Sequence, residues 1–257
     1  MKLSVVILAK NAEATIKKCI QSVTGVADTI VVVDDESSDQ TVSIAKLDKK
    51  VTVIEHKLVD FAAQRNFADE QTKADWILHL DADETLSEEL AQEIANIVSM
   101  AEGGTDTGYL AYYIRRRDFF WGRELRHGET ATARSKGFIR LYKRGSGSWK
   151  GAVHEHFETN AQTRQLGGLI NHHPHQTVAE FLTEVNRYST WRARELQKSG
   201  ARATFISLTV LPVAKFVYTY FFKGGFLDGP PGFAYSFMMS FHSFLVRAKL
   251  YQYTELS

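Results

Sequence analysis

The first hundred residues alternate between two hydrophobic periodicities, and this alternation restricts the fold more than any other feature. Four short apolar runs rich in valine and isoleucine are typical of buried strands. Between them, and after the last, apolar residues recur every three or four positions, as on one face of a helix. The predicted strands cover 3–8, 30–33, 51–54 and 76–80, and the predicted helices cover 14–23, 41–47, 61–73 and 88–100. Strands that alternate with helices predict an α/β fold, with a mostly parallel sheet covered by helices on both faces.

The last of these predicted helices carries a start signal. Thr85 and Glu88 have the spacing of a capping box, in which two side chains satisfy each other's free backbone N–H groups. Leu90, Ile94 and Ile97 then follow at helical spacing. We therefore expect Thr85 to cap this helix.

The character of the sequence changes after the first hundred residues. Between 108 and 157, aromatic and β-branched residues alternate with arginine and are punctuated by glycine, which predicts strands and loops added to the edge of the sheet. From Arg115 to Arg144 there are ten Lys or Arg residues against three acids. An amphipathic helix follows over 177–197 and is expected to end at Gly200.

The C-terminal tail holds two uncharged apolar stretches. The first covers 203–222 and is interrupted by Lys215, and the second covers 233–246. Neither reaches the roughly 20 unbroken apolar residues of a spanning helix, and Pro212 is expected to kink the first. The tail therefore predicts a hairpin of two helices that lies in a membrane interface without crossing it.

These patterns divide the chain into an α/β domain over 1–175 and a helical, membrane-associated appendage over 176–257. After Gly200, five Lys or Arg residues oppose two acids, which favours an anionic membrane surface. Packing of both tail helices on the α/β domain, or a dimer interface, is the alternative.

Composition excludes several classes of protein. The net charge of +1 gives no support to nucleic-acid binding. The single cysteine, Cys19, rules out an intramolecular disulfide framework and lies in an apolar helical stripe, so we expect a core residue and a reducing compartment. The apolar run at the N-terminus is too short for a secretion signal, so we expect a cytoplasmic location.

Polar clusters follow three of the predicted strands. Ala9-Lys10-Asn11 follows the first strand, Asp34-Asp35 the second and Asp81-Ala82-Asp83 the fourth. Ligands of open parallel sheets bind outside the carboxyl ends of the strands. The chain has no Gly-x-Gly-x-x-Gly motif and no Walker loop. A divalent metal, Mg²⁺ or Mn²⁺, held by Asp81 and Asp83 would then neutralise a bound diphosphate.

The same segments carry a family resemblance. They are Val6-Ile7-Leu8-Ala9-Lys10-Asn11, Val33-Asp34-Asp35 through Thr41, Gln64-Arg65-Asn66, and Trp76 through Asp81-Ala82-Asp83-Glu84. In order and spacing they resemble family 2 glycosyltransferases, which implies the Rossmann-like GT-A fold. Trp149 through Glu155, and Gly225 through Gly229, resemble the branch that adds glucose to the inner core of bacterial lipopolysaccharide by a β-1,4 linkage.

The resemblance also implies roles for individual residues. Asp34 or Asp35 would contact the nucleoside of a UDP-sugar, close to the first motif with Ala9 and Asn11. Arg65 would steady the nucleotide, Asp81 would reach the ribose or the metal, and Asp83 would bind the metal. The family commonly has glutamate directly after the asparagine of the first motif, whereas this chain has Asn11-Ala12-Glu13. Glu13 is therefore left out of the predicted site.

Glu155 is the expected catalytic base, on the strength of the resemblance and of its glycine-containing loop with adjoining His and Trp. It would deprotonate the acceptor hydroxyl while the sugar is displaced from UDP with inversion. Alternatives stay open for single residues. Glu155 could instead pair with an arginine, Arg65 could be a surface residue, and Trp121 or Trp149 could stack on a sugar or pack in the core. His154, His172, His173 and His175 could touch the metal, although a polar loop is the favoured explanation for the last three.

The predicted function is transfer of a hexose, glucose as first candidate, to a lipopolysaccharide-core acceptor at the inner face of the membrane. A polyprenyl-phosphate or other glycolipid acceptor is the alternative within the family. A nucleotidyltransferase would carry a glycine-rich basic loop after the first strand, which is absent here. A non-catalytic, membrane-docked nucleotide-sugar-binding module would not need Asp81, Asp83 and Glu155 together.

Overall fold

The structure, a computed structural model, describes residues 1–104, 108–151, 155–174 and 177–255. The chain folds into two compact units. Unit 1 comprises Met1–Arg116 and Ser135–His172, and unit 2 comprises Arg117–Arg134 and His173–Ser257. The break after His172 lies close to the predicted boundary at 175. Residues 117–134, expected in the first domain, belong to unit 2.

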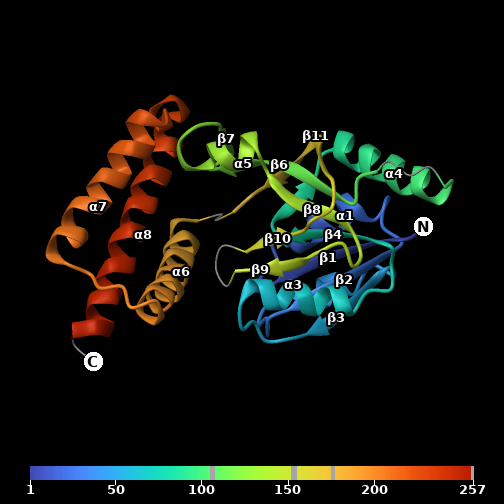
Figure 1. The fold of residues 1–257 in the computed structure, drawn as a ribbon, viewed down its shortest axis with the longest axis horizontal. Coiled ribbons are helices and arrows are strands. Elements are labelled where there is room, and N and C mark those ends of the chain that lie inside the picture. The colour runs from blue at the N-terminus through green and yellow to red at the C-terminus, as the bar shows by residue number, and fades with distance from the viewer. Residues whose placement is uncertain (105–107, 152–154, 175–176, 256–257) are drawn as a thin grey trace. The chain divides into compact units, whose positions relative to one another are not determined.

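A mixed sheet with a parallel core organises unit 1 (Figure 1). Its strand order is β3-β2-β1-β4-β8-β6-β11-β5. The strands are β1 Leu3–Ala9, β2 Thr29–Asp34, β3 Val51–Glu55, β4 Trp76–Asp81, β5 Glu84–Leu86, β6 Ala111–Phe120, β8 Phe138–Lys143 and β11 Thr163–His172. β1 to β4 pair in parallel, whereas β8 joins β4 antiparallel and β6 joins β8 antiparallel. The predicted parallel core is confirmed, and the later strands extend its edge.

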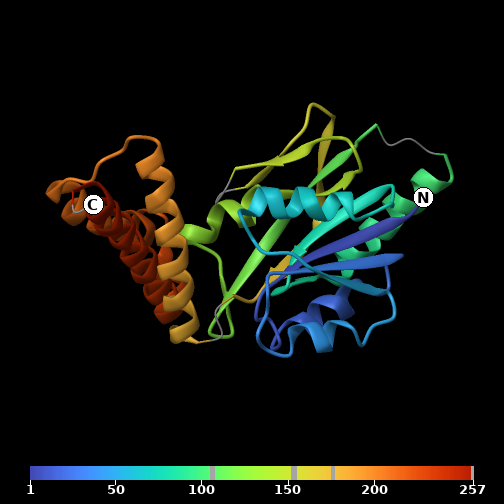
Figure 2. The same cartoon turned by 90° about the horizontal axis from the view of Figure 1, so that it is seen from below.

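Helices cover both faces of this sheet, because alternate residues of a strand point to opposite sides. The helices of unit 1 are α1 Ile16–Val23, α2 Thr41–Ala45, α3 Phe61–Glu70 and α4 Glu88–Glu102. Val5 and Ile7 pack in one core with α1 and α4, and Val6 packs in another with Ala62 and Ala68 of α3. Figure 2 shows α1 and α3 on opposite sides of the sheet. A second, two-stranded sheet pairs β9 Ser148–Lys150 with β10 His156–Glu158.

Two details of unit 1 bear on the sequence analysis. Cys19 is fully buried in the core of α1, as predicted. The predicted capping box is wrong, because Thr85 belongs to β5 and pairs with Asn171 of β11. Ser87 caps α4 instead, and its side chain accepts a hydrogen bond from the Leu90 N–H. Once Thr85 is part of the sheet, the next residue with a side-chain oxygen, Ser87, takes its place.

Unit 2 is mainly helical. Its elements are β7 Arg123–Leu125, η1 Gly128–Thr130, α6 Val178–Lys198, α7 Phe205–Val217, the π-helical turn η2 Tyr218–Phe222, η3 Gly225–Asp228 and α8 Gly229–Glu255, and α5 Ala131–Ser135 begins in it. Phe120 and Phe181 are buried against Tyr235 and Leu245 of α8. An ideal Cβ on Gly232 would lie 2.1 Å from the Gly225 carbonyl oxygen, so this close approach requires glycine.

The predicted tail hairpin is present as α7 with η2, followed by α8. Pro212 lies inside α7 without ending it, and its carbonyl accepts a hydrogen bond from the Ser240 hydroxyl at 2.7 Å. Among the described residues, one helical segment, Phe205–Phe222, is long and apolar enough to cross a membrane by length and composition. Only 11% of it is buried inside the protein.

Candidate active site

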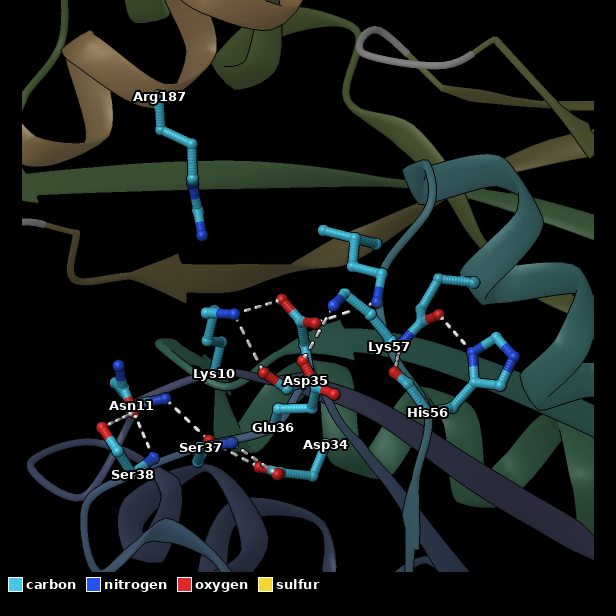
Figure 3. Close-up of polar contacts among 12 residues, drawn as sticks. Lys10, Asn11, Asp34, Asp35, Glu36, Ser37, Ser38, His56, Lys57 and Arg187 are labelled. Carbon is cyan, nitrogen blue, oxygen red and sulfur yellow. Dashed lines mark hydrogen bonds and ion pairs between the residues drawn. The ribbon is translucent and has the colours of Figure 1, made fainter.

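Two polar loops meet at the carboxyl ends of β1 and β2. Ala9 lies opposite Asp34 in the parallel register. Asn11 has a φ of 46°, in the left-handed region that asparagine tolerates. Its N–H donates to the Ser37 hydroxyl at 2.8 Å, and its side-chain oxygen accepts from the Ser38 N–H at 2.8 Å (Figure 3). The structure therefore brings together Ala9, Asn11 and Asp34, which were predicted to lie beside the bound nucleotide-sugar.

The two aspartates at the carboxyl end of β2, Asp34 and Asp35, differ in their partners (Figure 3). Asp34 is buried and accepts hydrogen bonds from the N–H and the hydroxyl of Ser37, at 2.8 and 2.6 Å. Asp35 forms an ion pair with Lys10 at 2.7 Å and accepts from the Leu58 N–H at 2.9 Å. Asp34 thus stabilises the turn that contains Ser37, whereas Lys10 compensates the negative charge of Asp35.

The loops around this pair are fastened by side chains that the sequence analysis did not place in the site. Glu13 accepts a hydrogen bond from the Gln40 N–H at 3.0 Å. Asp39 accepts from the Thr41 N–H at 3.0 Å, just before α2 begins. Both residues hold the first motif against the start of α2.

A second cluster forms beside the carboxyl end of β4, around the guanidinium of Arg65. Arg65 comes from α3 and is 1% exposed, so it is not a surface residue. Its Nη2 lies 2.7 Å from Asp81 Oδ1 and 3.0 Å from Glu155 Oε1. Three residues predicted from separate segments therefore meet. The pairing of Glu155 with an arginine, left open as an alternative role, is present in the same cluster.

Arg140 of β8 completes this cluster, although the sequence analysis did not select it. Its Nη2 lies 3.2 Å from Asp81 Oδ2 and 3.5 Å from Glu84 Oε1. Glu84 is fully buried and also faces Arg116 at 3.4 Å. The dense basic stretch from 115 to 144 was the feature of the sequence that could have indicated Arg116 and Arg140.

These cations determine the charge of Asp81. Burial alone would raise the pKa of this carboxyl, but Arg65 and Arg140 outweigh it and hold the pKa well below its ordinary value. The same carboxylates, with Glu84 and Asp81 foremost, outweigh burial and raise the pKa of Arg140. Asp81 is therefore an anion throughout the neutral range and presents its oxygens to two fixed cations.

Asp83 lies just beyond this cluster and has a different partner. His172, the last residue of β11, brings its Nε2 to 3.3 Å from Asp83 Oδ2. The Asp83 side chain is 33% exposed. Burial raises its pKa, but the adjacent imidazole outweighs this effect, so the pKa is lowered overall. The expectation of a polar loop at His172 is wrong, because this residue pairs with Glu84 of β5.

The residues around Asp83 fit a divalent metal that takes part of its ligands from a substrate. A partly exposed carboxylate and an imidazole nitrogen lie together, and both are metal ligands. Within the described residues, no three His, Cys, Asp or Glu side chains are placed to hold a metal on their own. Both oxygens of Asp81 already accept hydrogen bonds from arginines. His154 and His175 lie outside the described residues, and His173 stacks on Phe119 in unit 2.

Asn66 and Trp149 connect α3 with β9. Asn66 of α3 accepts from the Trp149 N–H at 2.9 Å and donates to its carbonyl at 3.0 Å, which fastens β9 to α3. The Trp149 ring is buried and lies 4.8 Å from the Arg65 guanidinium carbon. Core packing, one of its two predicted roles, is therefore the role it has. Trp121 in unit 2 is exposed, and its predicted stacking on a sugar stays a prediction.

Comparisons with known proteins identify the family and the fold. Residues 4–165 match the family model described as glycosyl transferase family 2. An uncharacterized glycosyltransferase of Rickettsia typhi is 32% identical over 97% of this chain and 86% of its own length. The lipopolysaccharide core biosynthesis glycosyltransferase LpsC of Rhizobium meliloti is 30% identical over 98% of this chain and 93% of its own. The crystal structure of S. aureus TarS 1–349 in complex with UDP-GlcNAc superposes with a TM-score of 0.50 at 12% identity, covering 100% of this chain and 93% of that one, which supports the fold alone.

Proposed function

The chain belongs to glycosyl transferase family 2, and we propose that it moves a hexose from a UDP-sugar to a glycolipid of the lipopolysaccharide-core type. The observation that carries this proposal is the meeting of Asp81, Arg65 and Glu155 beside the partly exposed Asp83. Similarity to LpsC supports the class of acceptor. Glucose is the first candidate for the sugar.

Different residues of unit 1 have different roles in the proposed reaction. Asp34 or Asp35 would contact the uracil, and Asp83 with His172 would hold Mg²⁺ or Mn²⁺, with Asp81 close by. The metal would supply positive charge to the diphosphate of the leaving UDP. Arg65 donates to Oε1 of Glu155, and among the described residues no hydrogen bond to Oε2 is present, so Oε2 would accept the proton of the attacking hydroxyl. Attack from the side opposite UDP gives inversion at the anomeric carbon.

Two other functions differ in what they require. A polyprenyl-phosphate acceptor would use the same donor site and the same base, so only acceptor assays separate it from the core-type acceptor. A non-catalytic nucleotide-sugar-binding module would not need a carboxylate held by a buried arginine. Hydrolysis or transfer of a UDP-sugar by the purified protein would separate the enzyme from this module.

A screen of UDP-sugars by thermal unfolding tests the donor. At a hundredfold excess over the dissociation constant, binding stabilises the folded state by roughly 2.7 kcal/mol. We expect one UDP-hexose to raise the unfolding temperature in the presence of Mn²⁺ and far less in a chelator. GDP- and ADP-sugars serve as controls. A shift with those sugars and none with UDP-sugars would overturn the assignment of UDP.

We also propose that unit 2 docks this enzyme on the cytoplasmic face of a membrane. The α7 face, defined as the exposed apolar side chains of α7 and η2, is uncharged. It comprises Phe205, Ile206, Val210, Leu211, Val213, Val217, Tyr218, Phe221 and Phe222. A contiguous apolar surface of this kind marks a protein or membrane interaction site. Arg202 and Lys223, which flank the segment, suit anionic headgroups.

One ion pair favours a helix that lies in the interface over one that crosses it. Lys215, in the last turn of α7, pairs with Glu129 of η1 at 2.7 Å. A spanning helix would draw Glu129 and its polar neighbours toward the hydrocarbon, where a charged group costs at least about 2.5 kcal/mol. With α7 parallel to the surface, this pair can stay on the protein side while the α7 face enters the lipid.

Replacing Phe205 and Phe222 with serine should release the protein from membranes. Both side chains are about four-fifths exposed, at 80% and 79%, so the free energy of unfolding should change little. Each substitution removes a large apolar group from the membrane interface, and we expect the double variant to bind vesicles with anionic lipid at least about tenfold more weakly. Leu47→Ser is the matched control, since Leu47 is 78% exposed in unit 1. Unchanged vesicle binding by the double variant in a flotation assay would contradict the docking surface.

A further inference from the structure

A series of hydrogen-bonded, buried polar side chains lies next to Arg65 and has no role in the reaction proposed above. His79, inside β4, is fully buried. Its Nε2 lies 2.6 Å from Asp69 Oδ1, and its Nδ1 lies 3.4 Å from Arg65 Nη1. The other oxygen of Asp69 accepts from the Tyr142 hydroxyl at 2.7 Å, and that hydroxyl accepts from Trp149 Nε1 at 2.8 Å. The series thus connects α3, β4, β8 and β9.

The direction of every hydrogen bond in this series is determined by its members. The Trp149 indole can only donate, so the Tyr142 oxygen accepts from it and its proton goes to Asp69. The Asp69 carboxylate can only accept, so Nε2 of His79 carries the ring proton. Nδ1 is then an acceptor, which is what an arginine N–H requires. Burial, only partly opposed by Asp69, lowers the pKa of His79, in agreement with a neutral ring.

Arg65 is therefore held on several sides. Nη1 faces His79, Nη2 donates to Asp81, and Nε with Nη2 donates to Glu155. The Trp149 ring supports the guanidinium. A fixed guanidinium plane keeps the carboxylates of Asp81 and Glu155 at a constant separation, since both accept from the same nitrogen.

We propose that His79, locked in its Nε2–H tautomer by Asp69, is a positioning residue that fixes the plane of Arg65 and thereby the base Glu155. This proposal rests on the proposed function of Glu155. Residues that orient a functional group from behind are worth about 10–100-fold in activity at metal sites. His79 does not touch substrate in this account, so its effect passes through Arg65.

Asp69→Asn tests the lock with a side chain of nearly the same size. Because the Tyr142 hydroxyl accepts from Trp149 and donates to position 69, we expect the amide oxygen of asparagine to turn to Tyr142 and the amide NH₂ to turn to His79. Nε2 must then accept, and the ring proton moves to Nδ1, where it faces the N–H of Arg65. We expect turnover to fall about 10–100-fold with the KM for the UDP-sugar changed less than about threefold. Asp28→Asn, which alters an acceptor of the Leu3 N–H elsewhere in unit 1, should keep full turnover.

A spectroscopic measurement reports on the lock independently of activity. ¹⁵N NMR of the assigned His79 ring should show the Nε2–H tautomer in the wild type and the Nδ1–H tautomer in Asp69→Asn. A purely structural role for Asp69 would lower the unfolding temperature without a selective loss of turnover. The Nδ1–H tautomer in the wild type would overturn the proposal.

A coupled variant separates this proposal from the proposed function. If the network acts through Arg65, Asp69→Asn should add less than about twofold to the loss caused by Arg65→Lys. Independent, multiplying losses would overturn the proposal. If Glu155→Gln keeps full turnover while Asp69→Asn loses it, the base is assigned wrongly, but the positioning of Arg65 stands through Asp81. A folded Asp69→Asn protein with wild-type turnover would refute the positioning role alone.

Discussion

Glu155→Gln is expected to lower turnover by about 10²–10⁴-fold, the typical contribution of a general base. Glutamine has nearly the same shape as glutamate. In the wild type, Nε and Nη2 of Arg65 donate to Glu155 Oε1, and the carbonyl oxygen of glutamine can accept the same two hydrogen bonds. The amide cannot take up a proton, so the attack of the acceptor hydroxyl loses its base. The KM for the UDP-sugar should change little, because the proposed role of Glu155 is to deprotonate the acceptor.

Steady-state kinetics with donor and acceptor varied separately measure this effect. Glu158→Gln is the matched control, since Glu158 is exposed on β10 of the same small sheet. It should retain full turnover. Wild-type turnover in folded Glu155→Gln would show that the base lies elsewhere.

Asp83→Asn is expected to lower transfer on the order of 10²–10³-fold. A divalent metal at a leaving diphosphate supplies several kcal/mol of transition-state stabilisation, and each 1.36 kcal/mol is a factor of ten in rate. Asp83 is partly exposed and its contact is with His172, so the fold should tolerate the change. The variant should also bind UDP more weakly in Mn²⁺ and become insensitive to chelator.

Asp75→Asn provides the control for this prediction. Asp75 accepts from the Lys2 N–H at 2.9 Å, away from the carboxyl end of β4, and its loss should leave the metal dependence unchanged. Full activity of the wild type in excess chelator would contradict the role of the metal. Equal chelator sensitivity in Asp83→Asn and wild type would show that the metal is held by other residues.

Local patterns in the sequence were sufficient for the parallel core and for the motif residues. Runs such as Val5 to Ile7 are buried on both faces, so they are apolar throughout, and the motifs follow directly at the strand ends. Asp81 could be proposed for the same reason, whereas Arg65 was proposed from the resemblance of Gln64-Arg65-Asn66 to the family. Their mutual contact could not be proposed, because it depends on how α3 packs against the sheet.

The position of Arg140 and the partner of His172 could not be predicted, because both depend on tertiary pairing. Arg140 reaches Asp81 because β8 inserts antiparallel beside β4, and nothing near residue 140 indicates that neighbour. His172 reaches Asp83 because β11 pairs with β5. The same pairing takes Thr85 into the sheet, which is why the expected capping box did not form. Strand order beyond the parallel core depends on contacts between residues far apart in the sequence, so local periodicity does not predict it.

The most direct test of the central claim, that this chain is a metal-assisted, inverting sugar transferase, is a transfer assay with product analysis. Purified full-length protein, Mn²⁺, a UDP-hexose labelled in the sugar and lipopolysaccharide-core acceptors would be incubated with vesicles, and the labelled product examined by NMR. We predict label in the acceptor, a β linkage from an α-linked donor, and no product with chelator. Label in the acceptor with the donor's own anomeric configuration, or undiminished transfer in chelator, would contradict the central claim.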